Sequence, residues 1–368
     1  MDRISINQPI IGRDEKIAVM RVLERKILTS ATELGGNEVR SLERSLKTYL
    51  GCKHVIAVNS GTSALYASLL VLGIGPGDEV AVPSFSFVAT ANAVLLTGAK
   101  PVFVDISENS YAMSADDLQS KITPNTAAII PVHLYGHPAE MGAIRSVAVK
   151  NGLPVVEDAA QSVGAQYQGK HTGTLGDLGC FSFHASKLIT SGEGGAIATN
   201  HDELSDKLRR IRTHGIARNG DPSIFGTNLR MGEVEAAILN IQLKRLTTFL
   251  DKRRRNAKEL SHLLSEKRGV ILPFSVKGGS SNWYLYTVSL DKARDRVLAK
   301  LNHMQVDARV YYRIPIHRSS FYRELGYRGE SLTRTEHASK RVISLPIHPG
   351  VTLKQIRRIA GILLTVVQ

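Results

Sequence analysis

The sequence has little cysteine and no long hydrophobic run. Its two cysteines, Cys52 and Cys180, cannot form a disulfide framework, and neither they nor the twelve histidines show the spacing of metal ligands. No apolar stretch is long enough to cross a membrane, and the first residues lack the apolar core of a signal peptide. We therefore expect a soluble, cytoplasmic globular protein with reduced thiols, no metal site and no membrane partner.

An excess of basic residues is confined to the second half of the chain. Residues 1–200 carry 16 Lys+Arg and 18 Asp+Glu, whereas residues 201–368 carry 31 and 15. That imbalance would suit a nucleic-acid-binding module. However, the sequence has no recognition module, no interleaved aromatic pattern and no basic low-complexity tail. Solvated helix faces account for most of the charge, so no nucleic-acid partner is expected.

The order of predicted elements indicates an α/β protein of two domains. Short apolar strands are expected at residues 79–83, 101–104, 127–132, 154–156 and 195–199, with helices such as residues 139–151 between them. A long helical stretch follows residue 233, with a break expected near Thr247. Strands at residues 283–290 and 308–312 and helices at residues 294–303 and 353–366 then form a smaller unit. We predict a large domain over residues 1–250, whose N-terminal segment could pack on the small domain, and a C-terminal α/β domain over residues 251–368.

A single lysine stands between a strand-like run and a glycine-rich turn. Lys187 follows the apolar residues 181–183 and precedes the glycines of residues 192–195. Loss of hydration in such a place favours the neutral, nucleophilic amine that pyridoxal 5′-phosphate (PLP) enzymes need to hold their cofactor as a Schiff base. The alternative is a surface lysine beside a turn.

An acidic pair follows a second apolar run. Asp158 is expected at the carboxyl end of a buried parallel strand, where open α/β sheets place their ligands. A carboxylate there can pair with a protonated pyridine nitrogen, and Gln161 can contact the ring hydroxyl. The alternative is that Asp158 caps the next helix.

A third segment has the character of a phosphate site. The turn formed by Ser60, Gly61 and Thr62 breaks a strand and begins a helix, whose free amides and dipole attract anions. The same turn could be an ordinary helix cap. Together, the three segments supply a phosphate cradle, a ring acid and a lysine, and this combination favours a PLP site over three separate coincidences.

Over almost its whole length the chain resembles the DegT/StrS family of PLP-dependent sugar aminotransferases. The matching motifs are residues 37–43, 75–80, 83–90, 101–105, 131–136, 157–161, 181–187, 226–231 and 315–317. The resemblance implies fold type I, the aspartate aminotransferase fold, with a large domain built on a mostly parallel sheet and a smaller C-terminal α/β domain. Because Lys187 is present, the chain does not resemble the dehydratase branch, in which histidine replaces the lysine.

The resemblance also assigns roles to individual residues. It makes Lys187 the residue that binds the cofactor and moves the proton, and Asp158 the partner of the pyridine nitrogen. The other implied cofactor contacts are Gly61, Thr62 and Ser182 at the phosphate, Phe87 stacked on the ring, Gln161 at the ring hydroxyl, and Asn228. In the family this asparagine reaches the phosphate from the neighbouring subunit, which implies a homodimer with composite active sites.

The implied reaction moves an amino group from an amino acid, with L-glutamate as the expected donor, to a keto group of a nucleotide-linked deoxy sugar for amino-sugar biosynthesis. Arg230, Arg313, His184 and His317 are candidate substrate contacts, although packing roles are open for both histidines. A keto-cyclitol acceptor and a regulator that keeps the fold with a degenerate site are the alternatives. The sequence fixes neither the nucleotide nor the ring position of the keto group.

Overall fold

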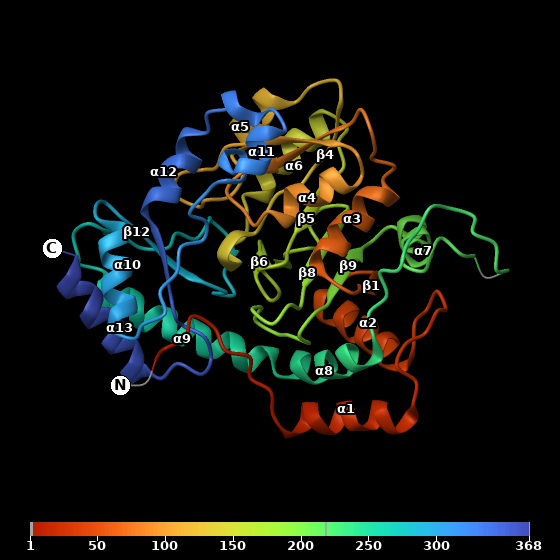
Figure 1. Ribbon diagram of the computed structural model, residues 1–368, viewed down its shortest axis with the longest axis horizontal. Helices are drawn as coiled ribbons and strands as arrows, with labels where there is room; N and C mark the ends of the chain where they lie inside the picture. Colours follow the sequence, from red (N-terminus) through yellow and green to blue (C-terminus); the bar gives the residue numbers. More distant parts are fainter. Residues whose placement is uncertain (1–2, 218, 368) are drawn as a thin grey trace.

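A mixed sheet forms the centre of the computed structural model, which describes residues 3–217 and 219–367 (Figure 1). Its strands form two hydrogen-bonded groups, in the orders β3-β2-β4 and β5-β8-β9-β1. Parallel bridges from Ile129 to Val155 and from Val132 to Asp158 join β4 to β5 and make one continuous sheet. The strands are β1 (His54–Val58), β2 (Glu79–Pro83), β3 (Lys100–Val104), β4 (Thr126–Ile129), β5 (Val156–Asp158), β8 (Leu178–Ser182) and β9 (Gly195–Thr199).

One strand of this sheet runs against the others. The pairs β2–β3, β2–β4 and β5–β8 are parallel, whereas β9 is antiparallel to both β8 and β1. The expected α/β class with a mostly parallel sheet is therefore confirmed. Parallel strands end at the same edge of a sheet, so the segments that follow β1, β2, β5 and β8 meet there.

Helices cover both faces of the sheet, which explains why its strands are apolar throughout. In β1, Ile56 and Val58 join one buried cluster, while Val55 and Ala57 join another on the opposite face. The covering helices are α2 (Asn37–Leu50), α3 (Gly61–Val71), α4 (Ala89–Leu96), α5 (Ala115–Lys121), α6 (Met141–Lys150) and α7 (Asp202–Ile211). The two-residue alternation of each strand thus supplies two cores.

Two consecutive helices lead from the sheet to the C-terminal elements. Figure 1 shows α8 (Glu233–Lys244) and α9 (Leu246–Leu264) in succession, with α1 (Arg13–Arg25) lying along α8. The helix break falls at Arg245, two residues before its expected position. None of the helices in the described part of the chain has both the length and the apolar character needed to cross a bilayer.

The C-terminal elements enclose their own buried cluster. β10 (Val270–Ile271), β12 (Tyr286–Leu290) and β13 (Val342–Leu345) form an antiparallel sheet, covered by α10 (Arg294–His303) and α13 (Leu353–Val366). Ile4 joins this cluster and bridges to Val306. The boundary at residue 250 stays a prediction. The shorter elements are β6 (Gln166–Tyr167), β7 (Lys170–His171), β11 (Gly279–Ser280), η1 (Leu134–Gly136), η2 (Ile316–Arg318), α11 (Ser320–Glu324), η3 (Tyr327–Gly329) and α12 (Thr333–Arg341).

The strand expected at residues 308–312 does not form. Its pairing is limited to one bridge between Arg309 and Ser344. Tyr311 and Tyr312 instead pack against the cluster that contains Phe85, next to a cavity. An aromatic run has a high strand propensity, but here side-chain packing determines the conformation.

Candidate functional site

A cavity of about 560 Å³ opens at the edge of the sheet where the parallel strands end. Its lining comes from segments that follow β1, β2, β5 and β8, and from the C-terminal elements. The lining residues are Ser60, Gly61, Thr62, Leu65, Phe87, Ala89, Asp158, Ala160, Gln161, Ser182, His184, Ser186, Lys187, Glu193, Tyr284, Leu285, Tyr311 and Tyr312. The edge predicted from strand order therefore coincides with an enclosed space of ligand size.

Lys187 is half-buried in the loop after β8 and lines this cavity. Its backbone N–H donates to the carbonyl of His184 at 2.8 Å, which fixes the turn. The side-chain Nζ lies 5.0 Å from the ring centroid of Tyr284. Within the described residues this amine has no carboxylate partner within ion-pair distance, so it remains available to a ligand.

Asp158 ends β5 and is 6% exposed. Its Oδ2 accepts from the Thr90 hydroxyl at 2.8 Å, and its Oδ1 accepts from the Ala160 amide at 3.1 Å. Burial raises the pKa of this carboxyl group, while the two hydrogen bonds and the charge of Lys187 oppose that rise. No helix follows directly, so the helix-cap alternative is wrong.

The start of α3 forms a cradle at the same edge. The Ser60 hydroxyl accepts from the amide of Ser63 at 3.0 Å, and the amides of Gly61 and Thr62, at the first two positions of the helix, have no intrahelical acceptor. A Cβ atom on Gly61 would lie 2.7 Å from Cβ of Ser182, so glycine permits the close approach of α3 to β8. Backbone amides, the helix dipole and the hydroxyl residues Ser60, Thr62 and Ser182 therefore meet at one end of the cavity, which suits a phosphate group.

Gln161 has its amide oriented by the surrounding chain. Oε1 accepts from the Tyr135 amide at 2.8 Å, so Nε2 faces the Tyr312 hydroxyl, 3.2 Å away, and the cavity. Phe87 also lines the cavity; this residue is 56% exposed, and its ring centroid lies 6.3 Å from that of Tyr312. A flat ligand between Asp158 and Phe87 would find both a hydrogen-bond donor and an aromatic surface.

Four of the predicted residues do not line the cavity. Asn228 is exposed, although its backbone lies close to Asn59, and Arg230 bridges to Val58 at the end of β1. Arg313 forms an exposed ion pair with Asp295 at 2.9 Å. His317 is fully buried, with Nδ1 2.6 Å from the Ser84 hydroxyl and Nε2 3.3 Å from Glu336.

His184 does line the cavity and is exposed, with Nδ1 2.9 Å from the Ser186 hydroxyl. Sequence reasoning missed the opposite wall of the cavity, which consists of Tyr284, Leu285, Tyr311 and Tyr312. The adjacent tyrosines Tyr311 and Tyr312 could have indicated an aromatic wall, but residues 308–312 were interpreted as a strand. Thr90, the partner of Asp158, also went unnoticed because nothing local links residues so far apart.

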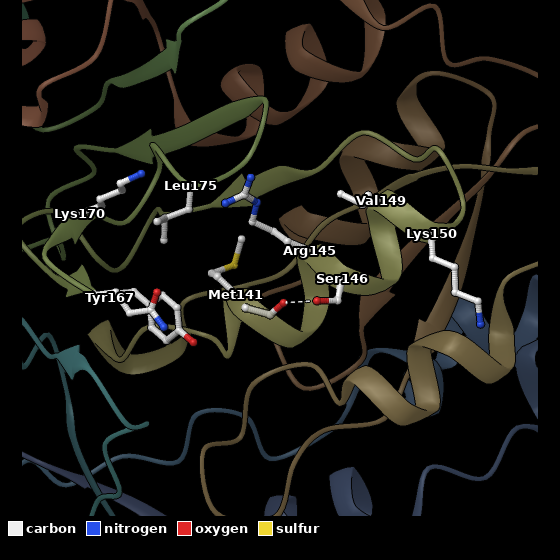
Figure 2. Close-up of a pocket in the computed structure, with 10 residues that line it drawn as sticks. Met141, Arg145, Ser146, Val149, Lys150, Tyr167, Lys170 and Leu175 are labelled. Carbon is white, nitrogen blue, oxygen red and sulfur yellow. Dashed lines mark hydrogen bonds between the residues drawn. The ribbon is translucent and has the colours of Figure 1, made fainter.

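A second cavity, of about 590 Å³, lies on the outer side of α6 and contains none of the predicted residues. Figure 2 shows Arg145 directed toward Leu175 over Met141, and Lys150 directed away from them. This cavity is more open than the first and includes no buried titratable side chain. We therefore place the functional site at the sheet edge, where predicted residues from four segments meet.

Comparison with known proteins gives consistent matches over nearly the whole chain. The model of the DegT/DnrJ/EryC1/StrS aminotransferase family matches residues 10–364. A curated relative, the UDP-N-acetyl-3-dehydro-alpha-D-glucosamine 3-aminotransferase of Acidithiobacillus ferrooxidans, is 42% identical, with 92% of this chain and 91% of the relative covered. The pleiotropic regulatory protein of Geobacillus stearothermophilus is 38% identical, with 95% and 96% covered. Among solved structures, S. venezuelae DesV in complex with a ketimine intermediate is similar, with a TM-score of 0.91, 36% identity, and 95% and 93% covered.

Proposed function

Because the chain belongs to the DegT/DnrJ/EryC1/StrS aminotransferase family, we propose that it transfers an amino group from an amino acid to a keto sugar linked to a nucleotide. The observation that carries this proposal is the meeting of Lys187, Asp158 and the start of α3 around one cavity. The named relative that acts on a UDP-linked 3-dehydro sugar supports a nucleotide sugar as the acceptor. L-glutamate is the expected donor.

The residues of the cavity fit PLP. The cradle at Gly61, which a Cβ atom would fill, and the nearby Thr62 and Ser182 suit the phosphate. Asp158 suits the pyridine nitrogen, Gln161 the ring hydroxyl and Phe87 the ring face. When bound, this cofactor acts as an electron sink that lets an amino group move between carbon skeletons.

Two side chains of this protein would perform the central steps. The Lys187 amine would hold the cofactor covalently, give way to the incoming amino group, and then move the proton of the donor's α-carbon to a second carbon atom. The Asp158 carboxylate would keep the ring nitrogen protonated, and burial strengthens this pairing by excluding water. Donor and acceptor would use the site in turn, so the kinetics should be ping-pong.

We propose a homodimer in which Asn228 completes the site of the neighbouring subunit. The exposed side chain of Asn228 and its position outside its own cavity support this arrangement. Mixing subunits that carry Lys187→Ala with subunits that carry Asn228→Ala tests it, because a mixed dimer would hold both defects in one site and leave the other intact. Activity that stays at the level of the separate variants would argue against a shared site.

His184, Arg230 and Arg313 remain candidate contacts for the sugar nucleotide, whereas the fully buried His317, bonded to Ser84 and Glu336, has the packing role that was its alternative. If Arg313 approaches the diphosphate, Arg313→Ala will raise the KM for the sugar nucleotide and leave the KM for glutamate unchanged. An unchanged KM for the sugar nucleotide would remove Arg313 from the site. The exposed ion pair with Asp295 contributes little by itself, so a fall in stability is not expected.

The decisive experiment joins cofactor trapping with a substrate panel. Purified protein supplied with PLP should become yellow, and borohydride should fix the cofactor on Lys187, as peptide mass analysis would show. The aminated form should then lose its absorbance with keto sugars linked to UDP, dTDP or GDP, but not with keto-cyclitols. Colourless protein, or reaction with keto-cyclitols alone, would overturn the proposal.

A regulatory role is the second candidate, because one similar protein is named a pleiotropic regulatory protein. The presence of the lysine, the ring acid and the phosphate cradle together argues against a degenerate site. Cofactor uptake without turnover on any member of the panel would favour the regulatory alternative.

A further inference from the structure

Directly behind Asp158, on the other face of the sheet, lie two titratable side chains that the proposed reaction does not use. Glu157 and His133 are both 0% exposed, and neither lines the cavity. Successive residues of a strand point to opposite faces, so Glu157 points away from the cavity where Asp158 points into it. The two carboxylates are adjacent in sequence, so a shift of the strand backbone at one residue also moves the other.

The Glu157 carboxylate has a full set of hydrogen bonds. Oε1 accepts from the amides of Leu175 and Gly176, each at 2.6 Å. Oε2 accepts from the amide of Gly173 at 2.8 Å and from Nε2 of His133 at 2.7 Å. Four donors offset the cost of burying this charge.

A backbone hydrogen bond determines which ring nitrogen of His133 carries the proton. Its Nδ1 accepts from the amide of Ala139 at 3.0 Å, so the ring carries its proton on Nε2 and donates to Glu157. The backbone amide of His133 also donates to the carbonyl of Asp158 at 3.1 Å, and the Asp158 amide donates to Pro131 at 2.9 Å. The segment after β4 therefore holds Asp158 by its main chain and Glu157 by its side chain.

Glycines allow the turn at residues 173–176 to approach so closely. A Cβ atom on Gly176 would lie 2.6 Å from the carbonyl oxygen of Val155, and one on Gly173 would lie 2.3 Å from the ring of Phe181. The same turn leads into β8, the strand that precedes Lys187. Glu157, at the centre of β5, thus connects this strand to the segment after β4 and to the turn at residues 173–176, next to the residue that lines the cavity.

We propose that Glu157 and His133 are a positioning pair that holds the Asp158 carboxylate at the depth and angle needed to face the ring of the cofactor. This inference rests on the proposed function, and neither residue touches the reacting atoms. A buried carboxylate seldom adds stability over apolar packing, but a fully satisfied polar network does fix one geometry. A site that needs a carboxylate at one defined point gains from such a network.

Two substitutions of His133 distinguish the hydrogen bond that Nε2 donates to Glu157 from the one that Nδ1 accepts from Ala139. His133→Gln can keep a donor near the position of Nε2, whereas His133→Asn can keep only the acceptor for Ala139. Glu157→Gln retains the shape but brings an N–H group toward backbone donors. Asp105→Asn is the matched control, because Asp105 also follows a strand, accepts from the amides of Arg334 and Thr335 at 3.0 and 2.8 Å, and lies outside the cavity.

Three quantities are measured for each full-length variant. The Kd is obtained by titrating the protein with PLP. The melting temperature and the pH at which the visible absorbance of the bound cofactor changes are measured on protein loaded with PLP. We expect Glu157→Gln and His133→Asn to weaken PLP binding about tenfold, which corresponds to one charge-assisted hydrogen bond. The absorbance midpoint should rise, because a ring that is less firmly protonated makes it easier for the neighbouring imine to keep its proton. His133→Gln should stay close to the wild type.

A purely structural pair would give a different pattern. Glu157→Gln, His133→Asn and Asp105→Asn would then all lower the melting temperature while the Kd for PLP and the absorbance midpoint stay at their wild-type values, and the inference would be wrong. If Glu157→Gln does not fold, the comparison of His133→Asn with His133→Gln decides the question. Wild-type protein that fails to bind PLP at all would instead refute the proposed function.

Discussion

The cavity has two walls that differ in construction. On the sheet side, Asp158, Gln161 and the start of α3 are held by hydrogen bonds to backbone amides and buried hydroxyls. On the C-terminal side, Tyr284, Leu285, Tyr311 and Tyr312 present aromatic and apolar surface. A wall rich in directed bonds suits a cofactor that must stay in one position, whereas an aromatic wall suits sugar and base rings.

Tyr135 joins the two walls. Its amide donates to Gln161 at 2.8 Å, its carbonyl accepts from the amide of Leu285 at 3.1 Å, and its hydroxyl donates to the carbonyl of Tyr311. The next residue, Gly136, leaves room for Asn282, because a Cβ atom there would lie 1.8 Å from Oδ1 of the asparagine. The positions of the two walls are therefore coupled through one short segment.

The largest effect is expected from the loss of Lys187, which lies on the sheet side of the cavity. Lys187→Ala should lower kcat by about 10⁴-fold or more, because the nucleophile and the proton carrier are lost together. Lys170→Ala, which changes a lysine in the outer cavity of Figure 2, is the control and should keep full activity. Turnover by Lys187→Ala comparable to the wild type would contradict the proposed role of the sheet wall.

Neutralising the ring acid should have the next largest effect. Asp158→Asn keeps an acceptor for the Thr90 hydroxyl but cannot hold a proton on the ring nitrogen, so kcat should fall about 10²-fold or more while the KM for the sugar nucleotide changes little. Steady-state kinetics with both substrates measures the two parameters. A change confined to KM would place Asp158 among the substrate contacts instead.

Where the sequence pattern is local, the positions that it indicates agree with the structure, while the chemical roles of these residues stay predictions. Lys187, Asp158 and Gly61 each stand at a strand end or helix start that a few neighbouring residues specify, and the bounds of α13 follow from its apolar period. Sequence reasoning failed where distant segments decide. The packing of Tyr311 and Tyr312 depends on Phe85 and Tyr135, and the antiparallel course of β9 depends on β1 and β8. Neither of these long-range contacts can be recognised from the pattern of a few neighbouring residues.

A substitution in the aromatic wall should change the KM for the sugar nucleotide more than it changes kcat. Tyr312→Phe keeps the ring but removes the hydroxyl that accepts from Gln161 at 3.2 Å, so the KM for the sugar nucleotide should rise about tenfold with a smaller change in kcat. Tyr327→Phe is the matched control, because that hydroxyl donates to the carbonyl of Pro101 at 2.6 Å and lies outside the cavity. If both variants alter KM equally, the hydroxyl of Tyr312 has no special place in the wall.

The segment that joins the walls should affect stability and leave activity almost unchanged, and the effect on stability depends on pH. His137 is buried against Trp283, with ring centroids 5.0 Å apart, and within the described residues neither ring nitrogen has a hydrogen-bond partner. Burial lowers the pKa of His137 from its ordinary value of 6.5 to about 4.

As pH falls from 6.5 toward 4, the unfolded chain takes up a proton at His137 that the folded chain does not, so the free energy of unfolding must fall across this interval. The loss can approach about 1.4 kcal/mol per pH unit for one such group. His137→Phe keeps a ring beside Trp283 and removes the titrating group. Denaturant unfolding at several pH values should show that the variant loses less stability on acidification than the wild type, because other groups, such as His348, titrate equally in both. Parallel pH curves for the two proteins would mean that the ring is protonated without cost and that this junction tolerates charge.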